Sequence, residues 1–369
     1  CKQKIVRSFV HFLTNLFTYY IGGLDYSMVK MVKMFCTSLF LKPCRSRLGL
    51  FHFYSTRKVK PIPVSFEFPT SEELLSSMEK PSETFVSREA EIFDREKERQ
   101  LSLIPRLEKI EIEYKGLPKD ETLIMNKHFS TPYNCAQHMT TSILERAPLA
   151  QFEGQLWDLH RPLISDGLLQ FLSFEDEEPH YVNNAFWRTC SFVLGCALKE
   201  AVKEDHGIQL HSFPPPNIRT GSFVYDFSLS LETWTPTEAE LRILSSQMIK
   251  IAKQELPIHR LNVSSEFAQE LFKNNEFKLK QIPDIASGSS DGMLTVYKLG
   301  NFVEISKGPM VAHTGFIGRC SVTAVHKLPG DGMFRCQAVA LPRSARLNYF
   351  AWEQVVRRGR KLNSSRLPS

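Results

Sequence analysis

The stretch AFWRTCSFVLGCALKEA, residues 185–201, carries apolar side chains at the spacing of an amphipathic helix. The positions of this apolar stripe are Phe186, Val193, Leu194, Ala197, Leu198 and Ala201. Asn184 is a residue type that caps helices, so we expect the helix to run from residue 185 to residue 203. This helix opens a unit whose other elements follow it in the chain.

Strand and helix signals continue as far as residue 341. Residues 223–229 alternate in the manner of a strand. The run TPTE at 235–238 predicts a capping box with proline at the first helical position, and Ser264 can cap another short helix. Further strands are expected over 294–305, as a pair around Gly300, and over 322–325 and 337–341.

A smaller module precedes the helix. Residues 107–114 alternate, with Ile110 and Ile112 on one face and Glu111 and Glu113 on the other, which predicts a half-buried strand. A short helix is expected over 133–139, and strand-like runs over 149–152, 155–158 and 168–174. Strands, a helix and more strands in this order indicate a β-grasp module, so the predicted fold class is α+β with two linked domains.

Residues 56–105 connect this module to the N-terminal part of the chain. Residues 56–85 contain four prolines and little periodicity, which is typical of a linker. Residues 87–103 predict a highly charged helix that Pro105 ends. Such a helix is either a solvated surface element or a docking element on a larger assembly.

The net charge of +6 is unevenly distributed. Residues 1–60 hold eleven Lys or Arg and the single acid Asp25, whereas the remaining residues hold more acids than bases. The basic balance is therefore no sign of a nucleic-acid-binding face on the folded body. Basic, hydroxylated, acid-poor sequence from Met28 onward is typical of a mitochondrial targeting segment, which we place at residues 1–54, with residues 1–27 upstream of this candidate start.

A membrane anchor and a secretory signal are the two competing interpretations of the N-terminal part. Residues 9–24 resemble a membrane anchor, but their apolar run is short and interrupted, and a spanning helix needs about 20 apolar residues. A secretory signal lacks its small-residue cleavage site. We therefore expect no membrane span and a location in the mitochondrial matrix.

The cysteines outside the predicted targeting segment are odd in number and form no C-x-x-C pair. They are Cys135, Cys190, Cys196, Cys320 and Cys336. This pattern indicates neither a disulfide framework nor a zinc site, so we expect small buried apolar side chains.

Several stretches together resemble the threonyl-tRNA synthetases. EKIEIEYKG (108–116), STPYNCAQHM (130–139) and residues 149–176 are similar to the TGS domain that opens those enzymes. The helix at 185–201, GSFVYDFSL (221–229) and NFVEISKGPMVAHTG (301–315) are similar to their editing domain. The resemblance runs in the same order over residues 106–355, and it implies a TGS domain followed by an editing-like domain.

The residues that would carry editing chemistry are replaced. The resemblance places H-x-x-x-H and C-x-x-x-H of the editing domain at Arg188, Phe192, Ser306 and Met310. Arginine has no lone pair to offer, phenylalanine has no acid–base atom, and serine and methionine are weak zinc ligands. The resemblance therefore implies a degenerate site without catalytic residues, metal or cofactor.

Neighbouring residues offer an alternative site. Cys196 lies one turn beyond Phe192, and His313 lies three residues past Met310, so both could join Ser306 in a rearranged constellation. A packed cysteine and an ordinary loop histidine explain the same pattern, and shared geometry decides between them. Arg188 could itself fill the former pocket by pairing with an acid or with an RNA phosphate, or else form a structural salt bridge or lie exposed.

One family combines these features. EIFDREKERQLSLIPRLEKIEIE (91–113), IMNKHFSTPYNCAQHM (124–139) and FWRTCSFVLGC (186–196) resemble the threonyl-tRNA-synthetase-like family of the mitochondrial large ribosomal subunit. The chain ends at Ser369 without the aminoacylation domains of a synthetase, and it contains no P-loop or G-x-S-x-G elbow. The resemblance implies a structural, non-enzymatic ribosomal role in mitochondrial translation.

The basic residues of the C-terminal end are the expected RNA contacts. The candidates are Arg343, Arg346, Arg357, Arg358, Arg360, Lys361 and Arg366, most of them in or after a helix predicted over 347–361. A frayed, solvated helix is the competing interpretation. The implied partners are mitochondrial ribosomal RNA and neighbouring large-subunit proteins, with no DNA.

Two other functions stay open at this point. One is a free-standing deacylase of misacylated tRNA, and the other is a TGS binding module outside the ribosome. The predicted division of the chain is 1–54 targeting segment, 55–105 linker and charged helix, 106–178 TGS-like domain, 179–341 editing-like domain and 342–369 basic helix and tail.

Overall fold

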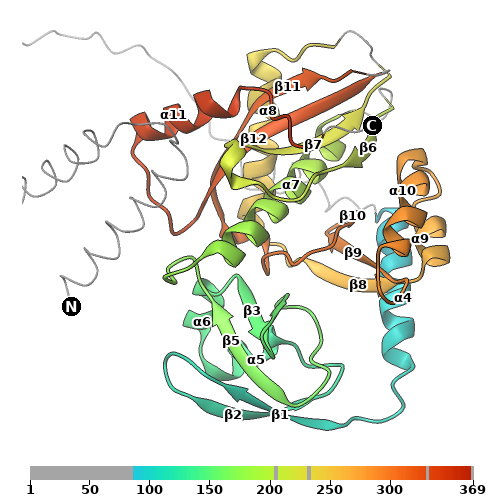
Figure 1. Cartoon of the computed structure of the whole chain (residues 1–369), viewed down its shortest axis with the longest axis vertical. Coiled ribbons are helices and arrows are strands. Elements are labelled where there is room, and N and C mark those ends of the chain that lie inside the picture. Colours follow the sequence, from blue (N-terminus) through green and yellow to red (C-terminus); the bar gives the residue numbers. More distant parts are fainter. Residues whose placement is uncertain (1–85, 203–206, 231–233, 330–331, 367–369) are drawn as a thin grey trace, which may run out of the picture. The chain divides into compact units, whose positions relative to one another are not determined.

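The computed structural model describes residues 86–202, 207–230, 234–329 and 332–366, all within one compact unit, Val86–Ser369. The predicted targeting segment and the predicted linker at 56–85 lie outside these residues. The described residues combine helices with three β-sheets, which confirms the α+β fold class (Figure 1). None of their helices is both long and apolar enough to cross a membrane.

Helix α4, Arg88–Ser102, confirms the charged helix predicted near this position. Ser87 caps it, because the Ser87 hydroxyl accepts a hydrogen bond from the Ala90 N–H at 3.2 Å. Ala90 and Phe93 are fully buried in the core of a neighbouring three-stranded sheet. One face of the helix is therefore part of the fold, and only its other faces meet solvent.

The first sheet has five strands in the order β2-β1-β5-β3-β4. Its strands are β1 (Lys109–Tyr114), β2 (Glu121–Asn126), β3 (Leu149–Phe152), β4 (Gln155–Trp157) and β5 (Gly167–Leu172). β1 and β5 are parallel neighbours, whereas the other pairs are antiparallel. Helices α5 (Pro132–Met139) and α6 (Thr141–Arg146) separate the first hairpin from the later strands. This is the β-grasp arrangement.

Alternation of apolar and polar side chains gives β1 of this sheet one buried and one exposed face. β1 buries Ile110, Ile112 and Tyr114 and exposes the residues between them, as predicted. Tyr114 packs with Ala136 of α5 and with Ile143 of α6. Burial of these side chains attaches the helices to one face of the sheet.

Helix α7, His180–Ala201, follows the β-grasp module and packs against β7, α8 and β12. It begins after Pro179 with no side-chain cap, so the prediction that Asn184 caps it was wrong. Every residue from 189 to 198 is buried, because other elements enclose the helix on all sides rather than along one stripe. Gly195 is required by this packing, since a Cβ there would collide with the Tyr225 ring.

The second sheet has four strands in the order β11-β12-β7-β6, and all neighbours are antiparallel. Its strands are β6 (Gln209–Ser212), β7 (Phe223–Ser228), β11 (Ile317–Lys327) and β12 (Met333–Pro342). Helix α8, Glu238–Lys253, packs against β11 and α7. Its cap is Thr237, paired with Glu240, so the capping box predicted at 235–238 was misplaced and Pro236 precedes the helix.

The third sheet, β10-β9-β8, is antiparallel. It consists of β8 (His259–Val263), β9 (Leu294–Leu299) and β10 (Phe302–Ile305), and helices α9 (Ser265–Leu271) and α10 (Glu276–Ser287) accompany it. Ser264 caps α9 as predicted, and the strand pair around Gly300 is confirmed. Gly300 has φ +55°, a conformation that favours glycine in the tight turn. α4, α9 and α10 share one core with this sheet.

The chain closes on helix α11, Tyr349–Gly359, which packs on β11 and β12. Trp352 packs with Val339 and Leu341 of β12, and partly buried Val355 and Val356 extend this cluster. Short 3₁₀ helices occur at η2 (Ile218–Thr220) and η3 (Thr314–Phe316).

Candidate functional sites: a filled pocket and a cationic C-terminal surface

The four positions carried over from the editing domain lie on two segments. Arg188 and Phe192 are one turn apart on α7, so they share a face of the helix. Ser306 and Met310 follow β10. Three of the four belong to one buried cluster around Tyr297, namely Arg188, Phe192 and Met310. Ser306 is connected to this cluster through Gly308, which lies against the Tyr297 hydroxyl.

Arg188 is used inside the protein. Its guanidinium donates a hydrogen bond to the Pro309 carbonyl at 2.8 Å, and burial lowers the pKa of Arg188. The partner is a backbone oxygen rather than the carboxylate or RNA phosphate that the sequence suggested. The side chain therefore links α7 to the segment that carries Met310.

Apolar side chains fill the adjoining space. Phe192 has no exposed surface, and its ring lies 5.1 Å from that of Phe302 and 6.5 Å from that of Tyr297, centroid to centroid. Met310 is also buried, at 1% exposure. Where the resemblance placed imidazole and thiolate groups, these side chains offer no metal ligand of comparable strength and no acid–base group.

The carboxylate of Asp158, just after β4 of the five-stranded sheet, completes the cluster. It accepts hydrogen bonds from the Tyr297 hydroxyl at 3.0 Å and from the Met310 N–H at 2.7 Å. It also pairs with the Arg260 guanidinium at 3.3 Å. Asp158 follows β4 directly, so a residue of the β-grasp module reaches the place that the resemblance assigns to the editing pocket. No motif or spacing in the sequence singled out Asp158, Tyr297 or Arg260 as members of this site.

Gly308 is needed for this closure. It has φ +66°, and a Cβ there would overlap the Tyr297 hydroxyl. The Ser306 hydroxyl accepts a long hydrogen bond from the Gly308 N–H, at 3.4 Å, and Ser306 is 8% exposed. Ser306 thus supports the turn that brings Met310 toward Asp158.

The alternative constellation is not assembled. The Cys196 thiol donates to Glu200 at 3.6 Å, whereas His313 stacks on Phe316 and its Nδ1 accepts from the Gly315 N–H at 3.1 Å. The described part of the chain holds no group of three or more His, Cys, Asp or Glu placed to bind a metal. The five described cysteines are buried and free, as predicted, and burial raises the pKa of Cys135 and of Cys320 to about 12.

The C-terminal cations differ in how they are engaged. Arg343 pairs with Glu255 at 2.5 Å, Arg360 pairs with Glu238 at 3.4 Å, and Arg358 donates to the Arg219 carbonyl at 2.9 Å. The side chains of the other four candidates are exposed and form no ion pair with any described residue; they are Arg346, Arg357, Lys361 and Arg366. The structure therefore leaves part of the predicted cationic set available to an anionic partner.

Buried polar side chains fix the backbone from Gly359 to Arg366, which carries Lys361 and Arg366. The Arg335 guanidinium binds both carboxylate oxygens of Asp226 at 2.7 Å and donates to the carbonyls of Asn363, Ser365 and Arg366. Gln337 donates to the carbonyls of Gly359 and Lys361, both at 2.8 Å. The tail is therefore held by the four-stranded sheet and is not a frayed extension of α11.

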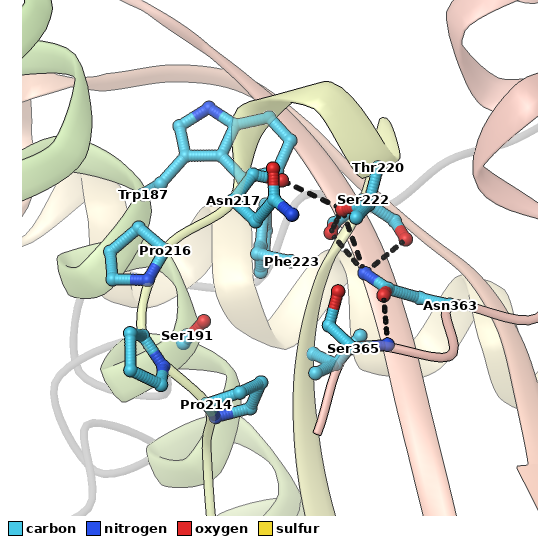
Figure 2. A pocket seen from close by; sticks show the side chains of 12 residues that line it. Trp187, Ser191, Pro214, Pro216, Asn217, Thr220, Ser222, Phe223, Asn363 and Ser365 are labelled. Carbon is cyan, nitrogen blue, oxygen red and sulfur yellow. Dashed lines mark hydrogen bonds between the residues drawn. The ribbon is translucent and has the colours of Figure 1, made fainter. Parts of the chain in front are cut away.

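Figure 2 shows how Asn363 completes this attachment. Its amide donates to the Ser222 carbonyl at 2.8 Å and to the Thr220 hydroxyl at 2.9 Å. The cavity beside it, next to the proline run at 214–216, measures only about 10 Å³, which is near the size of one water molecule. The cavity is too small for a substrate. Asn363 and Ser365 of the C-terminal tail form part of its wall.

A larger groove of about 580 Å³ lies elsewhere, beside η3. Arg146 and Arg343 line it together with Glu145, Glu175 and Glu255. Because both acids and bases line it, its charge favours neither an anionic nor a cationic ligand.

The chain matches no family model. It is 45% identical over 293 residues to the large ribosomal subunit protein mL39 of Drosophila melanogaster, and the aligned part covers 78% of this chain and 88% of the fly protein. The chain belongs to the mL39 family. Membership agrees with the resemblance that the sequence indicated.

More distant relatives of this mL39-family chain are ligases. It is 38% identical over 188 residues to the cytoplasmic threonine–tRNA ligase 2 of Bos taurus, covering 51% of the chain and 24% of the ligase. It is 34% identical over 203 residues to the mitochondrial threonine–tRNA ligase of Mus musculus, covering 55% of the chain and 26% of the ligase. The chain spans about a quarter of the length of these two ligases, so their activity does not transfer to it.

Two histidines near the filled pocket make the fold sensitive to acid. The rings of His160 and His259 lie 5.6 Å apart, and the His160 Nε2 is buried without a hydrogen-bond partner. The pKa of each histidine is lowered to about 4, chiefly by burial. The charge of Lys97 contributes to both shifts, and His313 contributes at His160, whereas the Ala312 backbone and Asp158 oppose the shift at His160 and Asp94 opposes it at His259. Both rings are therefore neutral in the folded protein at neutral pH.

Acid should consequently destabilise the protein through this pair. An unfolded histidine binds its proton near pH 6.5, so the unfolded state holds more protons between about pH 6.5 and pH 4, and stability is lost as the pH falls through this window. We expect His160→Gln to reduce the acid-induced loss between pH 7 and pH 4 by roughly 2 kcal/mol, measured by urea denaturation at each pH. His138→Gln, at an exposed position, is the control. Equal pH dependence of the His160 variant and the wild type would contradict the prediction.

Proposed function

We propose that the chain is a structural constituent of the mitochondrial large ribosomal subunit, located in the matrix, where it supports mitochondrial translation without catalysis of its own. One observation carries the proposal: in an mL39-family chain, Phe192, Met310 and the Asp158–Tyr297 pair are buried together where the resemblance places the editing pocket. A pocket closed by the protein's own side chains can hold the fold together but leaves no room for a substrate.

Its partners in this proposal are ribosomal RNA and neighbouring large-subunit proteins. An RNA-bound scaffold needs cations placed for phosphate contacts rather than reactive groups. Four exposed cations fit this need, namely Arg346, Arg357, Lys361 and Arg366. Hydrogen bonds from β12 hold the backbone of Lys361 and Arg366. Their positions at one end of the chain agree with an otherwise mildly acidic body.

The alternative functions have less support. A deacylase of misacylated tRNA would need an accessible site with acid–base or metal-binding groups, and Arg188 and Phe192 face the filled interior instead. No feature of the described residues favours a TGS module that acts outside the ribosome.

Sedimentation tests the proposed function. We expect the tagged chain, expressed in cultured cells, to sediment in a sucrose gradient of mitochondrial lysate with the large subunit, and to remain with it after the two subunits are separated by lowering Mg²⁺. The identity of the fraction is checked by its ribosomal RNA. A tagged chain found only in the light fractions, or purified protein that hydrolyses mischarged tRNA at a catalytic rate, would contradict the proposal.

The cationic surface is tested in the same gradient. The triple variant Arg346→Gln, Arg357→Gln, Lys361→Gln should shift a large part of the tagged chain from the large-subunit fraction to the light fractions, and more so as salt is raised, because each lost phosphate contact weakens binding. Lys115→Gln, Lys250→Gln, Lys253→Gln removes the same charge from exposed positions elsewhere and is the matched control. Equal incorporation of the two variants would exclude this surface as the RNA contact.

A further inference from the structure

Two adjacent aromatic side chains at the start of α11 are open to solvent. Tyr349 is 71% exposed and Phe350 is 76% exposed, whereas Trp352 on the same helix is 4% exposed. The apolar cluster under α11 is built from Trp352, Val355 and Val356 without them. The fold therefore does not use either ring to hold the helix in place.

The helical turn that carries the rings is nevertheless held in a defined position. Asn348 caps the helix, because its side-chain oxygen accepts from the Ala351 N–H at 2.8 Å. Trp352 fixes the same turn against Val339 and Leu341, and the exposed Arg319 guanidinium covers the Trp352 ring at 4.5 Å. An aromatic pair on an anchored helical turn loses little conformational freedom when it binds a partner.

The charges around the rings favour a polyanion. Residues 342–366 hold seven Lys or Arg and one acid, Glu353. Arg346 is exposed just before the rings, and Arg357 lies two helical turns after Phe350 on the same exposed face, about 10 Å along the helix axis. Cations on both sides of exposed rings match a chain that alternates phosphates with flat, apolar bases.

This geometry distinguishes unpaired from paired RNA. In a duplex the bases are stacked on each other, so their faces are closed to a protein side chain, whereas unpaired bases stack on Tyr and Phe rings. We propose that Tyr349 and Phe350 form a stacking platform for unpaired nucleotides of RNA, with Arg346 and Arg357 on the flanking phosphates. The inference rests on the proposed ribosomal function and names the kind of RNA that this surface takes.

Fluorescence anisotropy with the full chain tests the platform. The probe is a labelled single-stranded RNA of about 12 nucleotides, and its fully paired duplex is the second probe. The double variant Tyr349→Ala, Phe350→Ala should raise the Kd for the single strand about tenfold or more, because each stacked base contributes on the order of a tenfold change in affinity, and should change the Kd for the duplex far less. The conservative variant Tyr349→Phe should bind like the wild type.

Matched controls separate stacking from other roles. Ile243 is 60% exposed on α8, so Ile243→Ala removes an exposed apolar side chain elsewhere and should leave the Kd unchanged. Thermal melting of the double variant should match the wild type, since neither ring is buried. Unchanged single-strand binding, an equal loss for duplex RNA, or loss only of binding to lipid vesicles or to another protein would each overturn the platform.

The two proposals can fail separately. A wild-type chain that never enters the large subunit contradicts the proposed function, whatever its affinity for RNA. A wild-type chain that sediments with the large subunit, together with a double variant that binds single-stranded RNA as tightly, overturns only the platform.

Discussion

Replacing Arg335 with methionine is expected to lower the free energy of unfolding by about 3–5 kcal/mol. Arg335 has no exposed surface, and its guanidinium binds both oxygens of Asp226, which is 2% exposed. Burial raises the pKa of Asp226 even though Arg335 opposes the shift, so this carboxylate depends on its partner to remain charged. Without the guanidinium, the carboxylate and three tail carbonyls lose their partner; urea denaturation measures the loss.

A second variant and a surface control make this prediction specific. Arg335→Met with Asp226→Val removes both buried charges and should recover much of the loss, because an apolar pair avoids the desolvation of an unpaired carboxylate. Arg343→Met breaks an ion pair whose side chains are 69% and 51% exposed and should cost less than about 1 kcal/mol. If Arg335→Met were as mild as Arg343→Met, the buried pair would not be what stabilises this sheet.

This pair also connects the core to the proposed RNA surface. Arg335 holds the carbonyls of residues 363–366, and Gln337 on the same strand holds those of Gly359 and Lys361. The Arg335 variant should therefore loosen the tail and weaken RNA contacts without removing any exposed cation. Two residues of β12 thus act on the surface through the backbone they position.

Local rules were sufficient for elements whose signals lie within a few residues. Ser264 caps α9 as predicted, alternation identified β1, and the strand pair predicted around Gly300 is the β9–β10 pair. The capping box of α8 was placed two residues early, because a threonine followed three residues later by glutamate occurs at both 235 and 237. The two overlapping matches satisfy the same local rule, and only the folded backbone selects Thr237.

Other elements depend on contacts from distant parts of the chain. α10 was not predicted, since Pro283 interrupts its pattern, but burial of Ile282 and Lys278 stabilises it. α7 was predicted as a one-sided helix because periodicity cannot reveal a second covering layer. Propensity is overridden by tertiary packing in both cases.

The pocket shows the same limit for polar residues. The resemblance located Arg188, Phe192, Ser306 and Met310, but it gave no reason to select Asp158, which lies more than a hundred residues before Met310, just after β4. A buried carboxylate is intelligible only once its donors are known, here the Tyr297 hydroxyl, the Arg260 guanidinium and a backbone N–H. Periodicity reports exposure along one segment and carries no information on such long-range pairs.

A second large loss of stability is expected from Lys278→Met, about 3–5 kcal/mol in urea denaturation. Lys278 on α10 is 2% exposed and pairs with Glu304 on β10, which is 1% exposed. The Tyr225 hydroxyl of β7 donates to the same carboxylate, and the Ile305 N–H donates to it at 2.7 Å. These contacts join α10 and two sheets, but two neutral donors do not replace the cation that compensates a buried negative charge.

Removing the charge of Glu304 in the same molecule should reverse much of this loss. In Lys278→Met with Glu304→Gln, the amide oxygen still accepts from Tyr225 while no unpaired ion stays buried, so the double variant should be more stable than Lys278→Met alone. Lys273→Met breaks a pair whose side chains are 50% and 61% exposed, near the start of the same helix, and should cost less than about 1 kcal/mol. A double variant no more stable than the single one would mean that Lys278 contributes through the packing of its aliphatic chain rather than through its charge.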